Sequence, residues 1–221
     1  MKKAPLISVI IPSFNSQAYI GRCLRSLIKQ SLHEDMFEIL VINDGSLDQS
    51  NIILNSYGDS IKVINNKTNI GLPASLNKAI KKSKGKYIVR VDSDDYVNDN
   101  FLLFLQSYLD FNPHAHAVAC DYYLVNDYEE LIKRCNTADD PIACGIMFRK
   151  NSFLDIGLYD EEFRGHEDLE FRIRFLAKYE IAQLKIPLYR YRRHENNMTN
   201  DKEHMDSFLE NIKKKHKAWE E

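Results

Sequence analysis

The stretch Tyr87–Asp95, which reads YIVRVDSDD, decides the fold because it joins an apolar strand to a cluster of carboxylates. Its first five residues form a mostly apolar run rich in β-branched side chains, which is typical of a strand covered on both faces of a parallel sheet. Asp92, Asp94 and Asp95 follow directly. Since ligands of open α/β sheets bind beyond the carboxyl ends of the strands, this acidic cluster lies where a binding site is expected.

The chain before this stretch alternates strand-like and helix-like segments. Apolar runs predict strands over residues 7–11, 37–42, 61–64 and 87–91. Apolar residues at helical spacing predict helices over residues 19–28, 52–57 and 72–82. Asn15 or Ser16 is expected to cap the first helix. The alternation predicts right-handed crossovers and therefore an α/β fold, with a mostly parallel central sheet flanked by helices.

The second half of the chain is less regular. It predicts helices over residues 101–109 and 169–178, and strands over residues 117–125 (a strand or hairpin), 142–148 and 186–191. A length of 221 residues suits one domain or two closely joined halves. We expect one domain over residues 1–200, with halves meeting near residue 95, and a lysine-rich helical tail over residues 201–221.

Composition excludes several classes of protein. Thirty Lys and Arg against 32 Asp and Glu give a net charge of -2, so nothing in the charge balance supports a nucleic-acid partner. No apolar run is long enough to span a membrane, and no cleavage pattern follows the basic N-terminus. The four cysteines form no C-x-x-C pair, which indicates reduced thiols. We therefore expect a cytoplasmic protein.

Polar residues gather at the carboxyl ends of three predicted strands. Ser13 and Asn15 follow the first strand, Asn43 and Asp44 follow the second, and the acidic cluster 92–95 follows the fourth. In a parallel sheet these three loops converge on one crevice.

The acidic cluster predicts a metal site, because neighbouring carboxylates repel one another unless a cation or hydrogen-bond donors neutralise them. Mg²⁺ and Mn²⁺ take such oxygen ligands together with substrate phosphates, whereas a solvated Asp-rich turn is the alternative. The chain has neither G-x-G-x-x-G nor a P-loop sequence. What remains is an α/β domain that holds a nucleotide diphosphate through an acid-bound metal.

Six short motifs together resemble the signatures of family 2 glycosyltransferases. In chain order they are SVIIPSFN (8–15), VINDGS (41–46), NIGL (69–72), VDSDD (91–95), HED (166–168) and YRRH (191–194). The resemblance extends over residues 6–199. It implies a GT-A fold and an inverting transferase that uses a nucleotide-diphosphate sugar, with UDP as the favoured carrier. Residues 6–95 would then be the donor half, and residues 96–200 the acceptor half.

The resemblance also implies roles for individual residues. The donor-binding set is Pro12, Ser13, Asn15, Asp44, Asn69, Gly71, Asp92, Ser93 and Arg193. The set for Mn²⁺ or Mg²⁺ is Asp94, Asp92 and His194. Asp168 matches the general base that deprotonates the acceptor hydroxyl, with His166 and Glu167 as acceptor contacts. Asp168 opens a predicted helix, whose dipole favours an ionised carboxylate there.

Arg193 and His194 have a second interpretation, since late basic residues can either clamp a diphosphate or solvate a strand end. The chain departs from the common family pattern at Ser75-Leu76-Asn77, where many members have Ala-Arg-Asn. Lys78 and Arg90 are the neighbouring cations that could replace the missing arginine.

Two other functions compete with the transferase. One is a non-catalytic nucleotide-sugar-binding module, which would be expected to lack Asp94 or Asp168. The other is a sugar nucleotidyltransferase, which usually has a glycine-rich basic loop after its first strand.

For the transferase, we expect an acceptor that is a glycan or a lipid-linked sugar, in bacterial surface polysaccharide or glycoconjugate synthesis.

The basic tail also has two interpretations. Lys213, Lys214, Lys215 and Lys217 predict a solvated helix face. The alternative is peripheral contact with the inner face of the membrane, to which Trp219 could contribute an anchor.

Overall fold

The computed structural model describes residues 4–195, 197–200 and 202–216. Its strands are β1 (Ile7–Ser13), β2 (Phe37–Asn43), β3 (Lys62–Asn65), β4 (Tyr87–Arg90), β5 (Tyr96–Val97), β6 (Ala117–Val125), β7 (Leu131–Cys135), β8 (Ile146–Arg149) and β9 (Ile181–Arg192). Its α-helices are α1 (Ile20–Ile28), α2 (Ser50–Asn55), α3 (Leu72–Lys82), α4 (Phe101–Phe111), α5 (Lys150–Ile156), α6 (Glu167–Leu176) and α7 (Lys202–Lys215).

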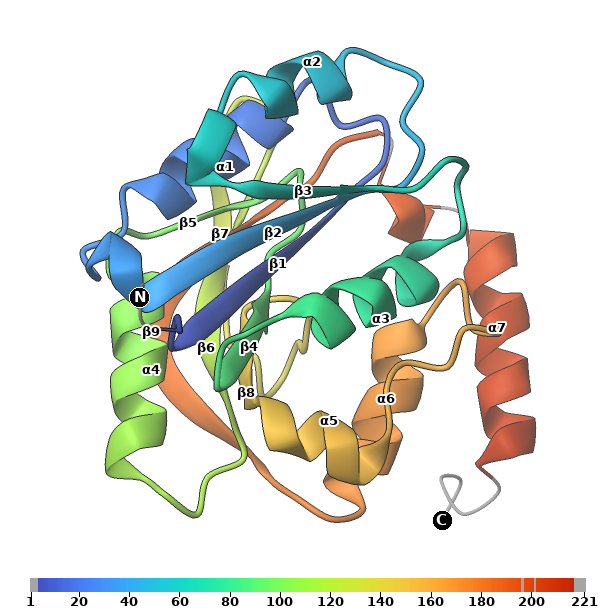
Figure 1. Cartoon of the computed structure of the whole chain (residues 1–221). Coiled ribbons are helices and arrows are strands. Elements are labelled where there is room, and N and C mark those ends of the chain that lie inside the picture. Colours follow the sequence, from blue (N-terminus) through green and yellow to red (C-terminus); the bar gives the residue numbers. More distant parts are fainter. Residues whose placement is uncertain (1–3, 196, 201, 217–221) are drawn as a thin grey trace.

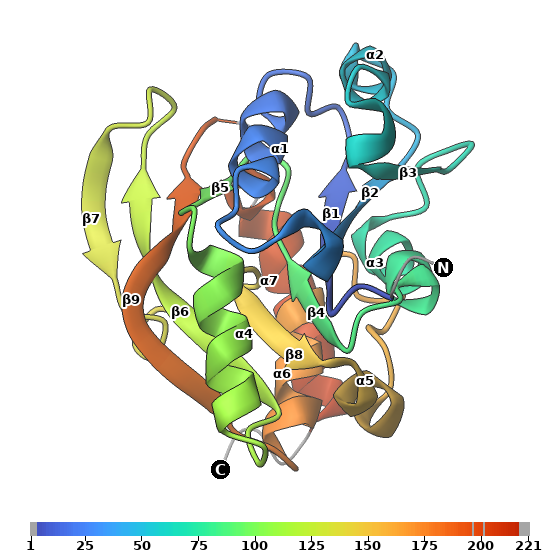
Figure 2. The same cartoon turned by 60° about the vertical axis from the view of Figure 1, so that its left-hand side comes forward.

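The strands form one twisted sheet in the order β3-β2-β1-β4-β8-β6-β9-β5, with β7 paired to β6 (Figures 1 and 2). The strands β1 to β4 pair in parallel, as the alternation of strands and helices predicts. The second half adds antiparallel pairs, in which β8 runs against both β4 and β6. The predicted α/β fold, one sheet flanked by helices, is confirmed.

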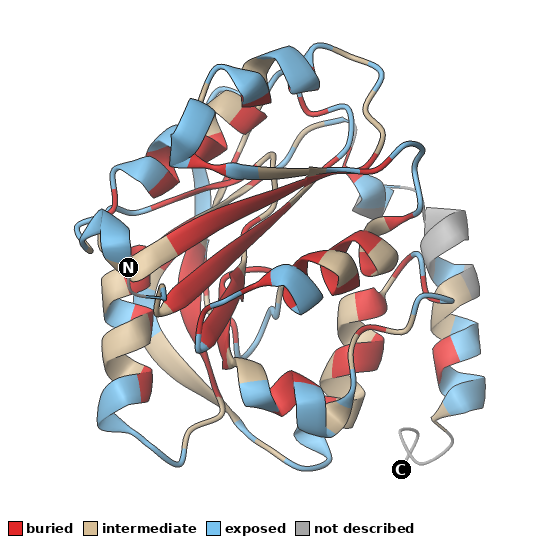
Figure 3. Ribbon diagram, viewed as in Figure 1, coloured by how far each residue is buried: buried red, intermediate tan, exposed pale blue. Residues whose placement is uncertain are grey.

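Each face of the sheet has its own apolar core, because successive side chains of a strand point to opposite faces. Ile7, Val9 and Ile11 of β1 pack with α1, α2 and α4, whereas Ile10 packs with α3, α5 and α6. Figure 3 shows buried residues concentrated in the strands and on the inner faces of the helices. The double coverage explains why β1, β2 and β4 are almost continuously apolar.

Several elements differ from their predicted bounds. The strand predicted over 142–148 is β8 at Ile146–Arg149, because Gly145, at φ +73°, turns the chain before it. Asn15 and Ser16 do not cap α1, which begins at Ile20 after Tyr19. The strand predicted over 186–191 is longer, β9 at Ile181–Arg192. Neither α5 nor the edge strand β7 was expected, since four of the five β7 residues are exposed and give no apolar pattern.

The predicted helical tail is α7, which lies beside α6 (Figure 1). Its Ile212 is fully buried. Lys213 and Lys214 are exposed as expected, but Lys215 forms two ion pairs with the domain and is not merely solvated. Lys217 and Trp219 lie outside the described residues. Within the described part of the chain, no helix combines the length and apolarity needed to cross a bilayer.

Candidate active site

Strand register brings the first polar loops together. Ser13 pairs with Asn43 across β1 and β2, and Asn43 pairs with Asn65 across β2 and β3. Asn43 Nδ2 also donates to Asn65 Oδ1 over 3.0 Å. Ile10 pairs with Arg90, so the acidic loop after β4 starts at the same edge of the sheet. The predicted convergence of these loops is therefore present.

Asp44 organises the loop that precedes α3. Its carboxylate is buried and accepts from the backbone N–H groups of Ile70 and Gly71, each over 3.0 Å. Asn66 Nδ2 donates to the same carboxylate over 2.7 Å. Gly71 has a φ of +94°, a conformation that favours glycine, and Asn69 Oδ1 accepts from its N–H. Asp44, Asn69 and Gly71 thus form one hydrogen-bonded unit.

Asn15 joins the loops that follow β1 and β2. Its backbone has a φ of +49°, its Oδ1 accepts from Leu47 N over 2.9 Å, and its N–H donates to Ser46 Oγ over 3.0 Å. Ser13 Oγ lies 2.7 Å from Ser16 Oγ, while Pro12 ends the apolar part of β1 one residue earlier. Pro12, Ser13 and Asn15 therefore lie at the carboxyl end of β1, beside the loop that follows β2.

Asp94 and His194 meet although they are far apart in sequence. Asp94 Oδ2 lies 2.9 Å from His194 Nε2, and Asn197 Nδ2 donates to the same oxygen over 3.4 Å. The imidazole stacks on Tyr19, with ring centroids 4.6 Å apart. Two of the three predicted metal-binding residues, Asp94 and His194, are therefore in direct contact.

Asp92 points instead toward Arg90. Arg90 Nε and Nη2 donate to the two oxygens of Asp92 over 2.6 and 3.1 Å, and Nη1 donates to Glu167 Oε1 over 2.8 Å. The Arg90 side chain is only 10% exposed and that of Glu167 only 5%. One buried guanidinium thus connects the acidic loop of the first half with the N-terminus of α6 in the second.

Asp95 is part of the scaffold behind this loop. Its oxygens accept from Tyr189 Oη over 2.7 Å and from Arg192 N over 2.8 Å. Tyr189 Oη in turn accepts from Asp92 N, and Arg192 Nε donates to the carbonyl of Asp94. One carboxylate oxygen each of Asp92 and Asp95 and the Cys144 Sγ lie within 4.8 Å of one another. These three residues together could hold a metal ion. Ser93 lies in the same turn.

Burial changes the ionisation of three carboxyl groups. Desolvation raises the pKa of Asp92, although Arg90 opposes the shift, and it raises the pKa of Asp95 well above its usual range. Desolvation likewise raises the pKa of Glu167 to about 7, against the attraction of Arg90. Neutral and ionised forms of Glu167 are therefore both accessible near neutral pH.

The acceptor-side residues surround the start of α6. His166 adopts the left-handed conformation, with a φ of +56°, directly before the helix, and Glu167 and Asp168 form its first turn. Asp168 Oδ2 accepts from Arg172 Nη2 over 2.8 Å, and its side chain is 23% exposed. Asp168 therefore lies at the N-terminus of α6 and forms an ion pair with Arg172 one turn further along the helix.

Sequence reasoning missed the residues that hold the site in place. Arg192 reaches the acidic loop, where its Nε donates to the carbonyl of Asp94, and the guanidinium of Arg193 lies over the Tyr191 ring. Leu76, at the position of the common family arginine, is buried in the apolar core, and Lys78 donates to Asn66. Of the two proposed replacements, only Arg90 contacts the acidic loop. In the sequence, Arg90 could have been noticed as a charged residue within an apolar strand.

This arrangement defines a GT-A-type nucleotide-sugar domain, in which an acidic loop at the carboxyl ends of parallel strands faces a second half that carries a carboxylate pair. The match to the family Glycosyl transferase family 2 covers residues 8–216. The chain belongs to glycosyl transferase family 2.

Individual relatives agree with this assignment. A poly(ribitol-phosphate) beta-glucosyltransferase of Bacillus spizizenii is 44% identical over 101 residues, which are 44% of this chain and 16% of the relative. The crystal structure of Staphylococcus aureus TarS 1-349 in complex with UDP-GlcNAc superposes with a TM-score of 0.78 at 25% identity, covering 93% of this chain and 65% of TarS 1-349.

A more distant structure shares the fold. The mannosyltransferase PcManGT from Pyrobaculum calidifontis, in complex with GDP-Man and Mn²⁺, gives a TM-score of 0.75 at 15% identity, covering 96% of this chain and 64% of that protein. The chain spans less than two thirds of the length of the curated relatives it matches, from 16% to 63% for the first two.

Proposed function

We propose that the chain is an inverting glycosyltransferase that moves a sugar from a nucleotide-diphosphate donor to a hydroxyl of a glycan or lipid-linked acceptor. The observation that carries the proposal is the Arg90 bridge, with Asp92 on one side and Glu167 on the other, 2.6 and 2.8 Å away. The bridge joins a donor-side carboxylate to the residue next to the proposed base. A transferase must hold the donor sugar and the acceptor hydroxyl at a fixed separation from each other.

The donor would lie along the loops that follow β1, β2 and β4. Pro12, Ser13 and Asn15 would border the nucleotide, and the loop fixed by Asp44 would surround its base and ribose through Asn69 and Gly71. Asp92, Ser93 and Arg193 would contact the donor sugar and its diphosphate. UDP is the proposed carrier, and the structural similarity to TarS bound to UDP-GlcNAc supports it.

The residues present fit a divalent cation. Asp94 and His194 would hold Mn²⁺ or Mg²⁺, because their oxygen and nitrogen already converge to 2.9 Å and the imidazole favours Mn²⁺ over the strictly oxygen-seeking Mg²⁺. Asp92 stays in the proposed set of metal ligands. Each of its oxygens uses one lone pair to accept from Arg90 and has a second lone pair for a cation. When bound, the ion would neutralise charge on the leaving diphosphate.

Asp168 would act as the base. It would accept the proton of the acceptor hydroxyl while that oxygen bonds to the anomeric carbon and the bond from that carbon to the diphosphate oxygen breaks. Attack opposite the leaving group inverts the anomeric configuration, and a positioned base typically contributes about 10²–10⁴-fold. His166 and Glu167 would orient the acceptor, with Glu167 fixed by Arg90.

The proposed setting is bacterial surface polysaccharide or glycoconjugate synthesis. The similarity to a poly(ribitol-phosphate) beta-glucosyltransferase supports a polymeric acceptor of this kind. A cytoplasmic location is proposed because all four cysteines are free and buried, as in proteins of reducing compartments. Contact between the tail and the inner membrane face stays a proposal as well.

A thermal-shift panel of UDP-, GDP-, dTDP- and CMP-sugars, with and without Mn²⁺, tests the donor. A ligand that binds only the folded state raises the midpoint of unfolding, so one nucleotide class is expected to stabilise the protein selectively. Product analysis with glycan acceptors then tests the transfer. Stabilisation without turnover by any acceptor would favour the binding module, and release of a nucleotide sugar from a sugar phosphate and a nucleoside triphosphate would favour the nucleotidyltransferase.

A further inference from the structure

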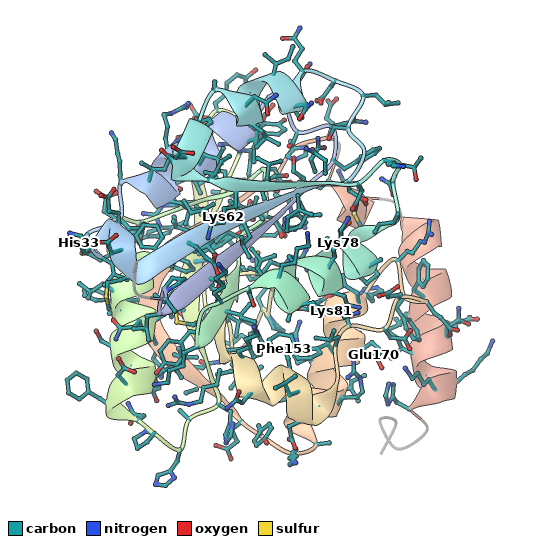
Figure 4. All side chains as sticks on the ribbon, in the orientation of Figure 1. His33, Lys62, Lys78, Lys81, Phe153 and Glu170 are labelled. Atoms are coloured by element: carbon teal, nitrogen blue, oxygen red, sulfur yellow. The ribbon has the colours of Figure 1, made fainter. Side chains whose placement is uncertain are left out.

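The last turn of α7 contacts a buried carboxylate on α6. Glu170 is 1% exposed and lies on the side of α6 that faces α7 (Figure 4). Arg174 of the same helix donates to Glu170 with Nη2 over 2.7 Å. From α7, Lys215 Nζ donates over 2.8 Å, and His216 Nε2 lies 3.1 Å away. A buried carboxylate that loses such partners is costly, so this contact fixes α7 on α6.

Lys215 also reaches the loop that leads into α6. Its Nζ donates to Asp160 Oδ2, and its charge lies 5.1 Å above the centre of the buried Phe163 ring. Asp160 and Glu170 bracket residues 161–169. One ammonium group therefore ties together both ends of the segment that carries His166, Glu167 and Asp168.

Other contacts hold this segment at separate points, and Arg90 fixes Glu167 near its end. Asn77 fixes its start, with Nδ2 donating to Tyr159 O over 2.8 Å and to Glu161 Oε1 over 3.0 Å. Between that point and Glu167, the chain turns through the left-handed residue His166. Without Lys215, the Asp160 carboxylate would lose its cation and keep the Glu162 N–H, so the loop would be held less firmly against α6.

We propose that Lys215 is a positioning residue that holds the acceptor-side segment 161–169 in place on α6. The inference rests on the proposed function, because the segment carries the proposed base. It gives the basic tail a role inside the catalytic domain, and the family match, which runs to residue 216, includes this residue.

The variant Lys215→Met tests the role, because it keeps the length of the side chain and removes the charge. Misplacement of a reacting group by about 1 Å costs on the order of 10²-fold. We expect kcat for transfer to fall roughly tenfold to hundredfold, while the Kd of the nucleotide is unchanged. Lys215→Arg should restore most of the rate. Lys213→Met and Lys214→Met are matched controls, since neither side chain has a hydrogen bond or ion pair within the described residues, and they should keep the wild-type rate.

Hydrogen exchange separates this proposal from the proposed function. Amides of residues 161–169 should exchange faster in Lys215→Met than in wild type or in Lys214→Met, whether or not a sugar is transferred. Asp160→Asn, which removes the other end of the contact, should give the same exchange pattern. Unchanged exchange and unchanged kcat in Lys215→Met would overturn the positioning role. Equal losses of nucleotide affinity and kcat would also overturn it, because they indicate general destabilisation. A wild-type protein without transfer activity would instead overturn the proposed function.

Discussion

Arg90 Nη1 donates to Glu167 Oε1 over 2.8 Å, although the two residues belong to different halves of the chain. Arg90 ends β4 and also holds both oxygens of Asp92. The contact explains how a charge is tolerated at the end of an apolar strand, since the guanidinium satisfies a carboxylate on each side. It therefore links a donor-side carboxylate to an acceptor-side carboxylate through one side chain.

Replacing Arg90 should therefore affect both sites. Arg90→Met leaves Asp92 and Glu167 without their shared cation, and breaking a buried pair in this way costs about 3–5 kcal/mol of stability. We expect that loss in urea unfolding, together with a transfer rate at least a hundredfold lower. Arg90→Lys keeps the charge but cannot reach both carboxylates. It should recover most of the stability and little of the rate. Full activity of Arg90→Met would show that the bridge is dispensable.

Glu167 should make stability depend on pH. Its pKa is about 7 in the folded protein, against an ordinary value of 4.5. Between these values the folded protein binds a proton that the unfolded chain has released, so the free energy of unfolding falls as pH rises through this window, by up to about 1.4 kcal/mol per pH unit.

The raised pKa values of the buried Asp92 and Asp95 also lower the free energy of unfolding as pH rises. The contribution of Glu167 is therefore measured as the difference between wild type and Glu167→Gln. Urea unfolding between pH 4.5 and 7 should show a smaller decline for the variant. Glu162→Gln is the control, because Glu162 is exposed and its side chain has no partner in the described chain. Identical declines for all three proteins would contradict the raised pKa of Glu167.

The metal assignment predicts coupling between Mn²⁺ and the nucleotide. Calorimetry should show tighter nucleotide binding with Mn²⁺ than in excess chelator, with a smaller gain for Mg²⁺. Asp94→Asn and His194→Gln should each abolish the gain, because each removes one of the two converging ligand atoms. Asp99→Asn, on the exposed side chain next to β5, should keep it. Equal nucleotide affinity with and without chelator would exclude the metal from donor binding.

The sequence predicts the donor-binding residues of the site better than the residues that hold them in place. Continuous β-branched runs identify β1, β2 and β4, and the polar residues after them necessarily meet at one edge of the sheet. Arg90, Tyr189 and Arg192 are different, because their contacts with Glu167, Asp95 and Asp94 join residues 77 to 98 positions apart. No local pattern in the sequence indicates such a long-range contact.

The tail shows the same limit. Lys213, Lys214 and Lys215 look identical in the sequence, yet only Lys215 faces Glu170. That difference depends on how α7 is rotated against α6, which a lysine run does not encode. The edge strand β7 escapes prediction for a related reason: its stability comes from pairing with β6 rather than from a buried face of its own.

The transfer rate of Asp168→Asn tests the central claim most directly. The substitution keeps the shape of the side chain and removes its ability to take a proton. With the donor identified by the thermal-shift panel, single-turnover transfer should fall by about 10²–10⁴-fold, while the Kd of the nucleotide stays near the wild-type value. A variant that retains more than about a tenth of the wild-type rate, a loss far below that of a missing base, would contradict the assignment of Asp168 as the base.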